Sequence, residues 1–177
     1  MTNLKILKSL CTSNGISGDE KKIRDIILSE ISEFVDEYKI DNLGNIIAFK
    51  KGKNRAKSKL LISAHMDEVG FMVQHISPDG YIYVIPIGNV DNRAKSYQKV
   101  VITTQQNESY IGLLQTSHDR LYIDIGVDSS QEIIDRHIAI GDMVTFASET
   151  CQLNDNRMMA KAVDDRIGCF ICKPLRI

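Results

Sequence analysis

The sequence has no tryptophan, and its 177 residues include only three prolines and four cysteines. The cysteines, Cys11, Cys151, Cys169 and Cys172, are few and unevenly spaced, which argues against a disulfide framework. No apolar run approaches the length of a membrane span, and the first ten residues lack the continuous apolar core of a signal peptide. We therefore expect a cytoplasmic protein that makes no use of a membrane.

The chain also lacks an excess of charge of either sign. Its formal net charge of -1 excludes the broad positive surface that nucleic-acid binding requires. The one basic cluster, residues 50–59, contains no aromatic residue, and we interpret it as a solvated loop rather than a phosphate-binding patch. With 43% hydrophobic and 25% charged residues, the composition is typical of a globular domain, alone or with a smaller insert.

Helical and extended patterns alternate at the two ends of the chain. Apolar residues recur at helical spacing over residues 4–11 and 19–38. Short strands are predicted at residues 39–41 and 45–49 around a turn at Gly44, and a buried strand at residues 59–64. This order indicates an α/β sheet, whose ligand sites lie beyond the carboxyl ends of its strands, and His65 occupies such a position.

The middle of the chain follows a different pattern, with short alternating segments separated by turn residues. Six strands are predicted there, at residues 70–75, 81–85, 99–104, 110–115, 121–126 and 143–147. The α/β pattern resumes near Lys161. We therefore expect a small β-barrel-like domain, residues 69–158, inserted into an α/β domain made of residues 1–68 and 159–177.

His65 and Asp67 follow the predicted strand 59–64 and are the first candidates for a functional site. Side chains at positions i and i+2 of an extended segment point to the same side. A histidine that ligates a metal through one ring nitrogen usually has the other held by an acceptor such as a carboxylate. An isolated His-x-Asp is also common as a loop pair that binds no metal. The rest of the sequence is therefore needed to choose between a metal site and a loop pair.

Asp164 and Asp165 open an apolar, helix-like segment almost a hundred residues downstream. One interpretation is that the acids cap the helix by accepting backbone N–H bonds. The other is that one carboxylate bridges two cations, because carboxylate and imidazole together suit zinc, cobalt or manganese. The residues alone leave both interpretations open.

Five short motifs, in this order, resemble metallopeptidase family forty-two, the glutamyl and deblocking aminopeptidases of the tetrahedral type, some of which are labelled endoglucanases. The two main ones run from His65 to Val73 and from Lys161 to Cys169. The other three occupy residues 13–20, 41–45 and 121–126. The resemblance covers the chain from its first helix to about Cys169 and implies a zinc-aminopeptidase-like fold with an inserted β-domain.

The resemblance implies a centre of two divalent metal ions, with His65 as a ligand of one ion and Asp164 bridging both. Asp67 then lies behind His65 as a catalytic residue that orients it, and Asp165 shapes the backbone beside the bridge. The implied reaction is hydrolysis of peptides at a free N-terminus. The β-insert implies homo-oligomerisation of the full-length protein.

The chain is about half as long as members of this family, whose remaining ligands and general base lie beyond the Asp-Asp-Arg motif. We expect the helix that contains Cys169 to end before Pro174, in a shortened or frame-shifted chain with little activity of its own. One alternative is a non-catalytic oligomerisation or binding module built on the β-domain. A redox or zinc role for Cys169 and Cys172 ranks lower, because buried free thiols explain that pair.

Three further histidines lie in the middle segment. His75 and His137 are interpreted as structural or solvated residues, since the first lies on an alternating strand and the second ends an amphipathic helix. His118 lies in a predicted loop where relatives often carry a Pro-Pro-His motif, and its role is left open.

Overall fold

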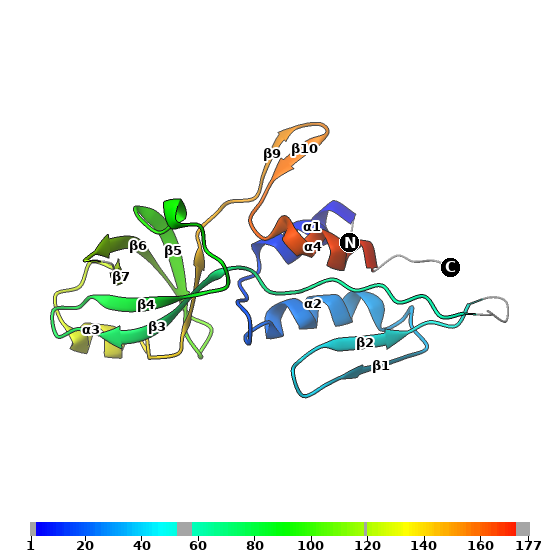
Figure 1. Ribbon diagram of the computed structural model, residues 1–177, viewed down its shortest axis with the longest axis horizontal. Coiled ribbons are helices and arrows are strands. Elements are labelled where there is room, and N and C mark those ends of the chain that lie inside the picture. Colours follow the sequence, from blue (N-terminus) through cyan, green and yellow to red (C-terminus); the bar gives the residue numbers. More distant parts are fainter. Residues whose placement is uncertain (1–2, 53–57, 119, 173–177) are drawn as a thin grey trace. The chain divides into compact units, whose positions relative to one another are not determined.

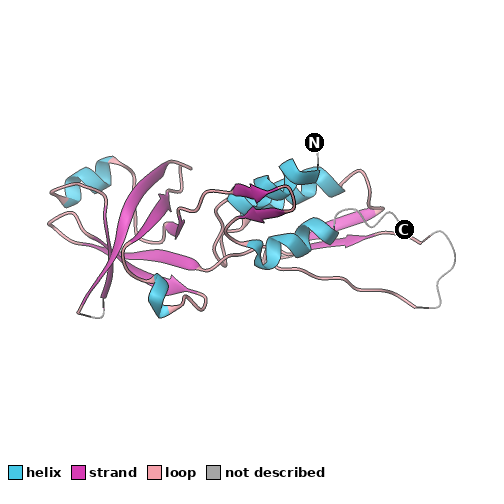
Figure 2. Cartoon of the chain, turned by 90° about the horizontal axis from the view of Figure 1, so that it is seen from above, coloured by secondary structure: helices cyan, strands magenta, loops and turns pink. Residues whose placement is uncertain are grey.

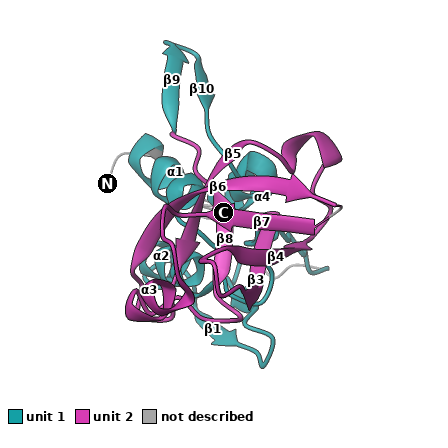
Figure 3. Ribbon diagram, turned by 90° about the vertical axis from the view of Figure 1, so that its left-hand side faces the viewer, with its two compact units in different colours: residues 1–67, 150–177 teal, residues 68–149 magenta. Residues whose placement is uncertain are grey.

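The computed structural model describes residues 3–52, 58–118 and 120–172. The chain divides into two compact units, residues 1–67 with 150–177 and residues 68–149 (Figure 3). Each unit has its own cluster of buried apolar residues. The predicted fold class, an α/β protein that contains a small β-barrel, is confirmed.

Residues 68–149 form a closed six-stranded barrel in the order β3-β4-β7-β6-β5-β8 (Figure 1). The strands are antiparallel and comprise β3 (Gly70–Ile76), β4 (Ile82–Ile87), β5 (Gln98–Thr103), β6 (Ser109–Ser117), β7 (Arg120–Asp124) and β8 (Met143–Phe146). All six predicted strands are confirmed to within a few residues. Because the sheet closes on itself, the barrel leaves no long unpaired edge.

The barrel core follows from alternation along the strands. Phe71 and Val73 of β3 point inward and are fully buried, and the same holds for Val100 and Ile102 of β5. The 3-10 turn η1 (Asn92–Ala94) and the helix α3 (Ser130–Asp135) complete this unit. Ile133 of α3 joins the core, so the short helix is held by tertiary packing rather than by its own length.

The first unit is built around three helices, α1 (Asn3–Thr12), α2 (Lys21–Ile31) and α4 (Val163–Cys172), with α1 beside α4 (Figure 1). Ile6 and Leu10 of α1 pack with Ile23 of α2, and Phe170 of α4 contacts the same cluster. The prediction that α2 reaches residue 38 is wrong, since the helix ends at Ile31. Residues beyond that point have no core to pack on in this unit and remain largely exposed.

Two hairpins complete this unit. The strands β1 (Glu37–Ile40) and β2 (Ile46–Phe49) pair as predicted, around a turn in which Gly44 has φ +87°. A left-handed residue of this kind suits glycine, because any Cβ would be strained there. The hairpin of β9 (Cys151–Asn154) and β10 (Arg157–Met159) was not predicted.

Residues 59–64, predicted to be a buried strand, are neither paired nor buried in the structure. They form an extended loop, seen in pink in Figure 2, and residues 59–63 are exposed. The apolar side chains of this segment are typical of a strand. A strand also needs a neighbour, however, and the described residues supply none for this segment.

No helix among the described residues is long and apolar enough to cross a membrane. The prediction that the last helix ends before Pro174 falls outside the described residues, which stop at Cys172.

Candidate metal-binding site

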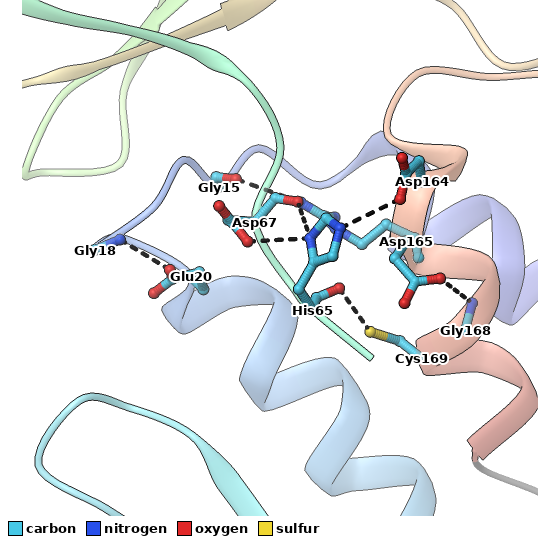
Figure 4. A network of polar contacts seen from close by, with 10 residues as sticks. Gly15, Gly18, Glu20, His65, Asp67, Asp164, Asp165, Gly168 and Cys169 are labelled. Atoms are coloured by element: carbon cyan, nitrogen blue, oxygen red, sulfur yellow. Dashed lines mark hydrogen bonds and ion pairs between the residues drawn. The ribbon is translucent and has the colours of Figure 1, made fainter. Parts of the chain in front are cut away.

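His65 lies between two carboxylates in the first unit (Figure 4). Its Nε2 atom is 3.2 Å from Oδ1 of Asp164, and its Nδ1 atom is 3.1 Å from Oδ1 of Asp67. Nδ1 also lies 3.2 Å from the backbone oxygen of Asp67. The structure therefore brings together the three residues that the sequence analysis singled out, across ninety-nine positions of the chain in the case of His65 and Asp164.

The charge of His65 follows from these contacts. Partial burial alone lowers the pKa of the imidazole, but the hydrogen bond to Asp164 and the charge of Asp67 together raise it above its usual value. Both ring nitrogens face acceptors, so both donate when the ring is protonated. A divalent ion at Nε2 would replace that proton, while Asp67 would continue to hold Nδ1.

The two adjacent acids have different partners. The Asp165 carboxylate accepts a hydrogen bond from the backbone N–H of Gly168 at 3.1 Å, which is the three-residue spacing of a helix cap. Asp164 instead directs its carboxylate to His65, and its side chain is 96% exposed. The peptide bond between the two acids is cis, and neither has helical backbone angles. The capping contact thus belongs to Asp165, whereas the contact with His65 belongs to Asp164.

Arg166 anchors the beginning of α4 to the end of α1. The side chain is fully buried, and its Nη1 donates to the backbone oxygens of Leu10 and of Ser13, the latter at 3.1 Å. Nη2 is 3.5 Å from the backbone oxygen of Gly15. Carbonyls at the end of a helix lack intrahelical partners and carry partial negative charge, so a guanidinium is well matched to them. This role of Arg166 was not predicted from the sequence.

His65 is also held through its backbone. The thiol of Cys169 donates to the backbone oxygen of His65 at 3.2 Å, and the neighbouring Met66 packs against the helical core. Further along, Lys161 donates to the side-chain oxygen of Asn14 at 2.8 Å and links the approach to α4 with the loop after α1. The segment 65–67 and the start of α4 are thus fixed to the same three-helix core.

The described residues fit part of a divalent-metal site. Imidazole and carboxylate are suitable ligands, and a carboxylate behind the imidazole is the usual arrangement around a metal-binding histidine. Among residues 3–52, 58–118 and 120–172, however, no three His, Cys, Asp or Glu side chains converge as a metal-binding group. His65 and Asp164 therefore form a pair of potential donors rather than a full ligand set.

The other three histidines belong to the barrel unit and have partners there. His75 lies against the ring of Tyr83, with centroids 5.8 Å apart, and His137 Nδ1 is 3.3 Å from a carboxylate oxygen of Glu108. His118 Nδ1 contacts the hydroxyl of the preceding serine at 3.0 Å. These contacts are ordinary surface pairs.

The thiols of Cys169 and Cys172 are free and lie one helical turn apart. Burial raises the pKa of Cys169 to about 11, and burial also raises the pKa of Cys172. Redox-active and metal-binding cysteines need a lowered pKa, because the thiolate is the reactive form. The raised pKa values disfavour a redox role, and among the described residues no three His, Cys, Asp or Glu side chains gather around the pair as a metal-binding group.

Comparison with known proteins identifies the family. The family model described as M42 glutamyl aminopeptidase matches residues 44–175. A lysyl aminopeptidase from Pyrococcus furiosus is 34% identical over 96% of this chain and 53% of its own. Among solved structures, an aminopeptidase from Desulfurococcus kamchatkensis superimposes with a TM-score of 0.89, at 34% identity, over 96% of this chain and 49% of its own. An endoglucanase from Thermotoga maritima superimposes with a TM-score of 0.82 at 40% identity, and the match covers 94% of this chain and 52% of the endoglucanase.

The TET1 peptidase of Pyrococcus horikoshii is 27% identical to this chain and superimposes with a TM-score of 0.83. The match covers 97% of this chain and 54% of the TET1 chain. The TET1 peptidase can assemble into a tetrahedron or a large octahedral shell. The chain spans about half the length of the curated relatives it matches. It belongs to the M42 glutamyl aminopeptidase family.

Proposed function

We propose that this chain provides part of the active site of a metal-dependent aminopeptidase, which removes N-terminal residues from peptides. The observation that supports this most directly is the contact of His65 Nε2 with Asp164 Oδ1, with Asp67 on the opposite ring nitrogen. Family membership makes peptide hydrolysis the reaction to test first. The four free thiols suit a reducing compartment, and we place the reaction in the cytoplasm.

The residues have separate tasks in this proposal. His65 and Asp164 would hold the divalent ions, and Asp67, in contact with Nδ1, would keep the imidazole in the orientation that leaves Nε2 for the metal. Zinc, cobalt and manganese all accept this combination of ligands. When bound, a pair of such ions polarises the scissile carbonyl and makes a water more acidic.

We also propose that the isolated chain has little or no peptidase activity. The described residues provide two potential donors, whereas a two-ion centre with open positions for water and substrate needs more. Metal binding by the isolated chain should therefore be weak.

Metal binding can be tested by calorimetric titration with zinc or cobalt at neutral pH. Asp164→Asn and His65→Ala should abolish the binding heat, while Asp165→Asn should retain it, because asparagine still caps the helix at that neighbouring position. His137→Ala is a second control, since this histidine belongs to the barrel unit. Binding that survives both His65→Ala and Asp164→Asn would show that the proposed site is wrong.

Catalysis is tested separately with aminoacyl anilides and added metal. Clear turnover by this chain, lost in His65→Ala, would support the peptidase function but contradict the proposed inactivity of the isolated chain. The peptidase function itself is tested by joining this chain to the half of the Pyrococcus furiosus relative that lies outside the match. Absence of turnover in that joined protein, when it binds metal, would contradict the peptidase function.

The second candidate is a non-catalytic module for assembly. It is favoured by the barrel, whose closed sheet and separate core make it complete within the proposed inserted domain, residues 69–158. Light scattering with and without metal distinguishes the two candidates. A stable oligomer that forms equally well without metal, in a chain that binds none, would favour the module.

A further inference from the structure

The barrel unit carries a groove of about 500 Å³ at the end of β8. Its walls come from η1 and the residue before it, from the start of β5 and from the chain that leaves β8. All of its lining residues lie between positions 91 and 148, and none belongs to the candidate metal site. The volume is within the range of about 300 to 1,000 Å³ that is typical of ligand pockets, so the groove is large enough for a small molecule or the end of a peptide.

The groove opens where β5 and β8 stop pairing. The ladder between them ends at Phe146, and the next residue, Ala147, donates its backbone N–H to the oxygen of Lys99 at 2.9 Å. Two residues before Lys99, the N–H of Tyr97 donates to the oxygen of Leu114 in β6 at 2.7 Å. No described backbone hydrogen bond joins the chain before Lys99 to the chain after Ala147. The two chains therefore separate, and both line the groove.

Two cations and one acid line the groove, and only one of the cations is neutralised. Arg93 donates through Nε and Nη2 to the two carboxylate oxygens of Asp91, at 3.1 and 2.7 Å. Lys99 forms no ion pair with a carboxylate of the described residues. Gln98 and Ser148 add an amide and a hydroxyl to the lining. The groove thus combines one uncompensated positive charge with neutral hydrogen-bond donors, which suits a single carboxylate.

The groove also has an apolar part, made by Phe146 and Ala147. The ring of Phe146 packs against the barrel core and meets the ring of Phe71 edge to face, with centroids 5.5 Å apart. The core therefore holds this ring in place. A ligand that lays an apolar group on it removes apolar surface from water, which favours binding.

This combination distinguishes between anionic ligands. A phosphate group brings about two negative charges and no apolar part. An acidic side chain inside a peptide carries its charge at the tip and brings no apolar group of its own. The C-terminal residue of a peptide, in contrast, carries a carboxylate and a side chain on the same Cα atom, so it matches the free cation and the apolar surface together.

We propose that the groove binds the C-terminal residue of a peptide, with the carboxylate on Lys99 and an apolar side chain on Phe146. Gln98 and Ser148 donate further hydrogen bonds to the carboxylate. The site lies within the barrel unit and requires no metal, so it does not rest on the proposed function.

The test is a titration of the full chain, without metal, with the peptide acetyl-Ala-Ala-Leu, followed by NMR of the backbone amides. We expect saturable shifts at residues 98–99 and 146–148. The same peptide with a C-terminal amide should bind about three- to fivefold more weakly, because it has no charge to pair with the ammonium. Acetyl-Ala-Glu-Ala amide and inorganic phosphate should bind no better than the amide.

Substitutions of opposite effect identify the charges involved. Lys99→Gln should weaken binding of the free acid about three- to fivefold, and Asp91→Asn should strengthen it, because it releases Arg93 for the ligand. The matched control is Lys95→Gln, since Lys95 donates to Asn92 at 2.7 Å and does not line the groove, and its effect should stay below about twofold. Circular dichroism and the melting temperature verify that each variant is folded.

Several results would overturn the proposal. They are equal affinity for the free acid and its amide, shifts outside the groove alone, and equal loss of binding in Lys99→Gln and Lys95→Gln. Tighter binding of the glutamate peptide or of phosphate would assign the groove to another anion. His65→Ala should leave binding unchanged, and loss of binding in that variant would place the peptide at the candidate metal site instead.

Discussion

Replacing Arg166 by methionine tests whether a buried cation holds the site together. Methionine has a similar length and removes the charge, but it cannot donate to the backbone oxygens of Leu10, Ser13 and Gly15. Each buried carbonyl left without a partner costs about 1 to 3 kcal/mol. The Gly15 contact, at 3.5 Å, lies at the limit of hydrogen bonding and contributes least.

The net loss of stability is smaller than the sum of these costs, because the variant no longer has to desolvate a guanidinium. We therefore expect Arg166→Met to destabilise the first unit by about 3 kcal/mol. Arg166→Lys should cost less, since an ammonium retains the charge, although it lacks the planar fork that reaches several carbonyls at once.

Hydrogen exchange followed by mass spectrometry is the suitable assay, because the two units can unfold separately and a single melting curve could hide a local effect. Amides in α1 and α4 should exchange about a hundredfold faster in Arg166→Met, which corresponds to about 3 kcal/mol. Amides of the barrel should be unchanged.

The matched control is Arg136→Met in the barrel unit. Arg136 also donates through Nη1 to a backbone oxygen, that of Glu132 at 2.6 Å, but its side chain is 37% exposed. Water can replace a hydrogen bond at such a position, so the loss should stay below about 1 kcal/mol. Equal effects of the two substitutions, or unchanged exchange in α1 and α4, would refute the anchoring role of Arg166.

Three further predictions concern local structure. Hydrogen bonds, chiefly from Asn45, lower the pKa of Asp41, so their stabilising effect should be complete above the carboxyl's ordinary pKa and disappear as the pH falls through the lowered one. NMR titration should show this pKa rising in Asn45→Ala, and an unchanged pKa would contradict the prediction. The pKa of Cys169 is raised to about 11, so only about 0.1% of its thiol is thiolate at pH ~8. Cys169 should therefore resist alkylation by iodoacetamide until the chain is unfolded. Rapid labelling of Cys169 in the native chain, measured by peptide mapping, would contradict this prediction. Ser129→Ala should destabilise the barrel unit by about 1 kcal/mol in urea titrations, since Ser129 accepts a hydrogen bond from the backbone N–H of Glu132 and caps α3, whereas Ser129→Asp should cost little.

The barrel was the part of the fold that sequence reasoning predicted best. Its strands are short, alternate between apolar and polar residues and are separated by turns such as the one at Gly80. The sequence of each strand therefore indicates a strand by itself. Because the barrel is closed, the strands that pair with it all lie within the same stretch of chain. The β9–β10 hairpin lacks that alternation, and its residues are mostly exposed, so little in its sequence distinguished it from a loop.

The errors of prediction lie in the first unit, where pattern alone is not sufficient. The segment expected to be helical as far as residue 38 has helical periodicity, and residues 59–64 have the nearly continuous apolar run of a buried strand. In the structure, the apolar side chains of these segments lack a surface to cover them, so α2 ends at Ile31 and the strand remains unpaired. Periodicity reports how a segment would be buried, and burial itself depends on what packs against it.

The site shows the same limit at the level of single residues. The residues of the acid pair alone did not tell which of the two adjacent acids would face the histidine, and it was the family resemblance that assigned this position to Asp164. Arg166, which is anchored to the carbonyls at the end of α1, directly follows the two residues of α4 that lack helical backbone angles. Asp165 accepts the hydrogen bond of the Gly168 N–H, and Asp164, one position earlier in the non-helical part of α4, is in contact with His65. The contacts of Asp165 and Arg166 hold the neighbours of Asp164 in place, a tertiary arrangement that the spacing of the two acids alone does not provide.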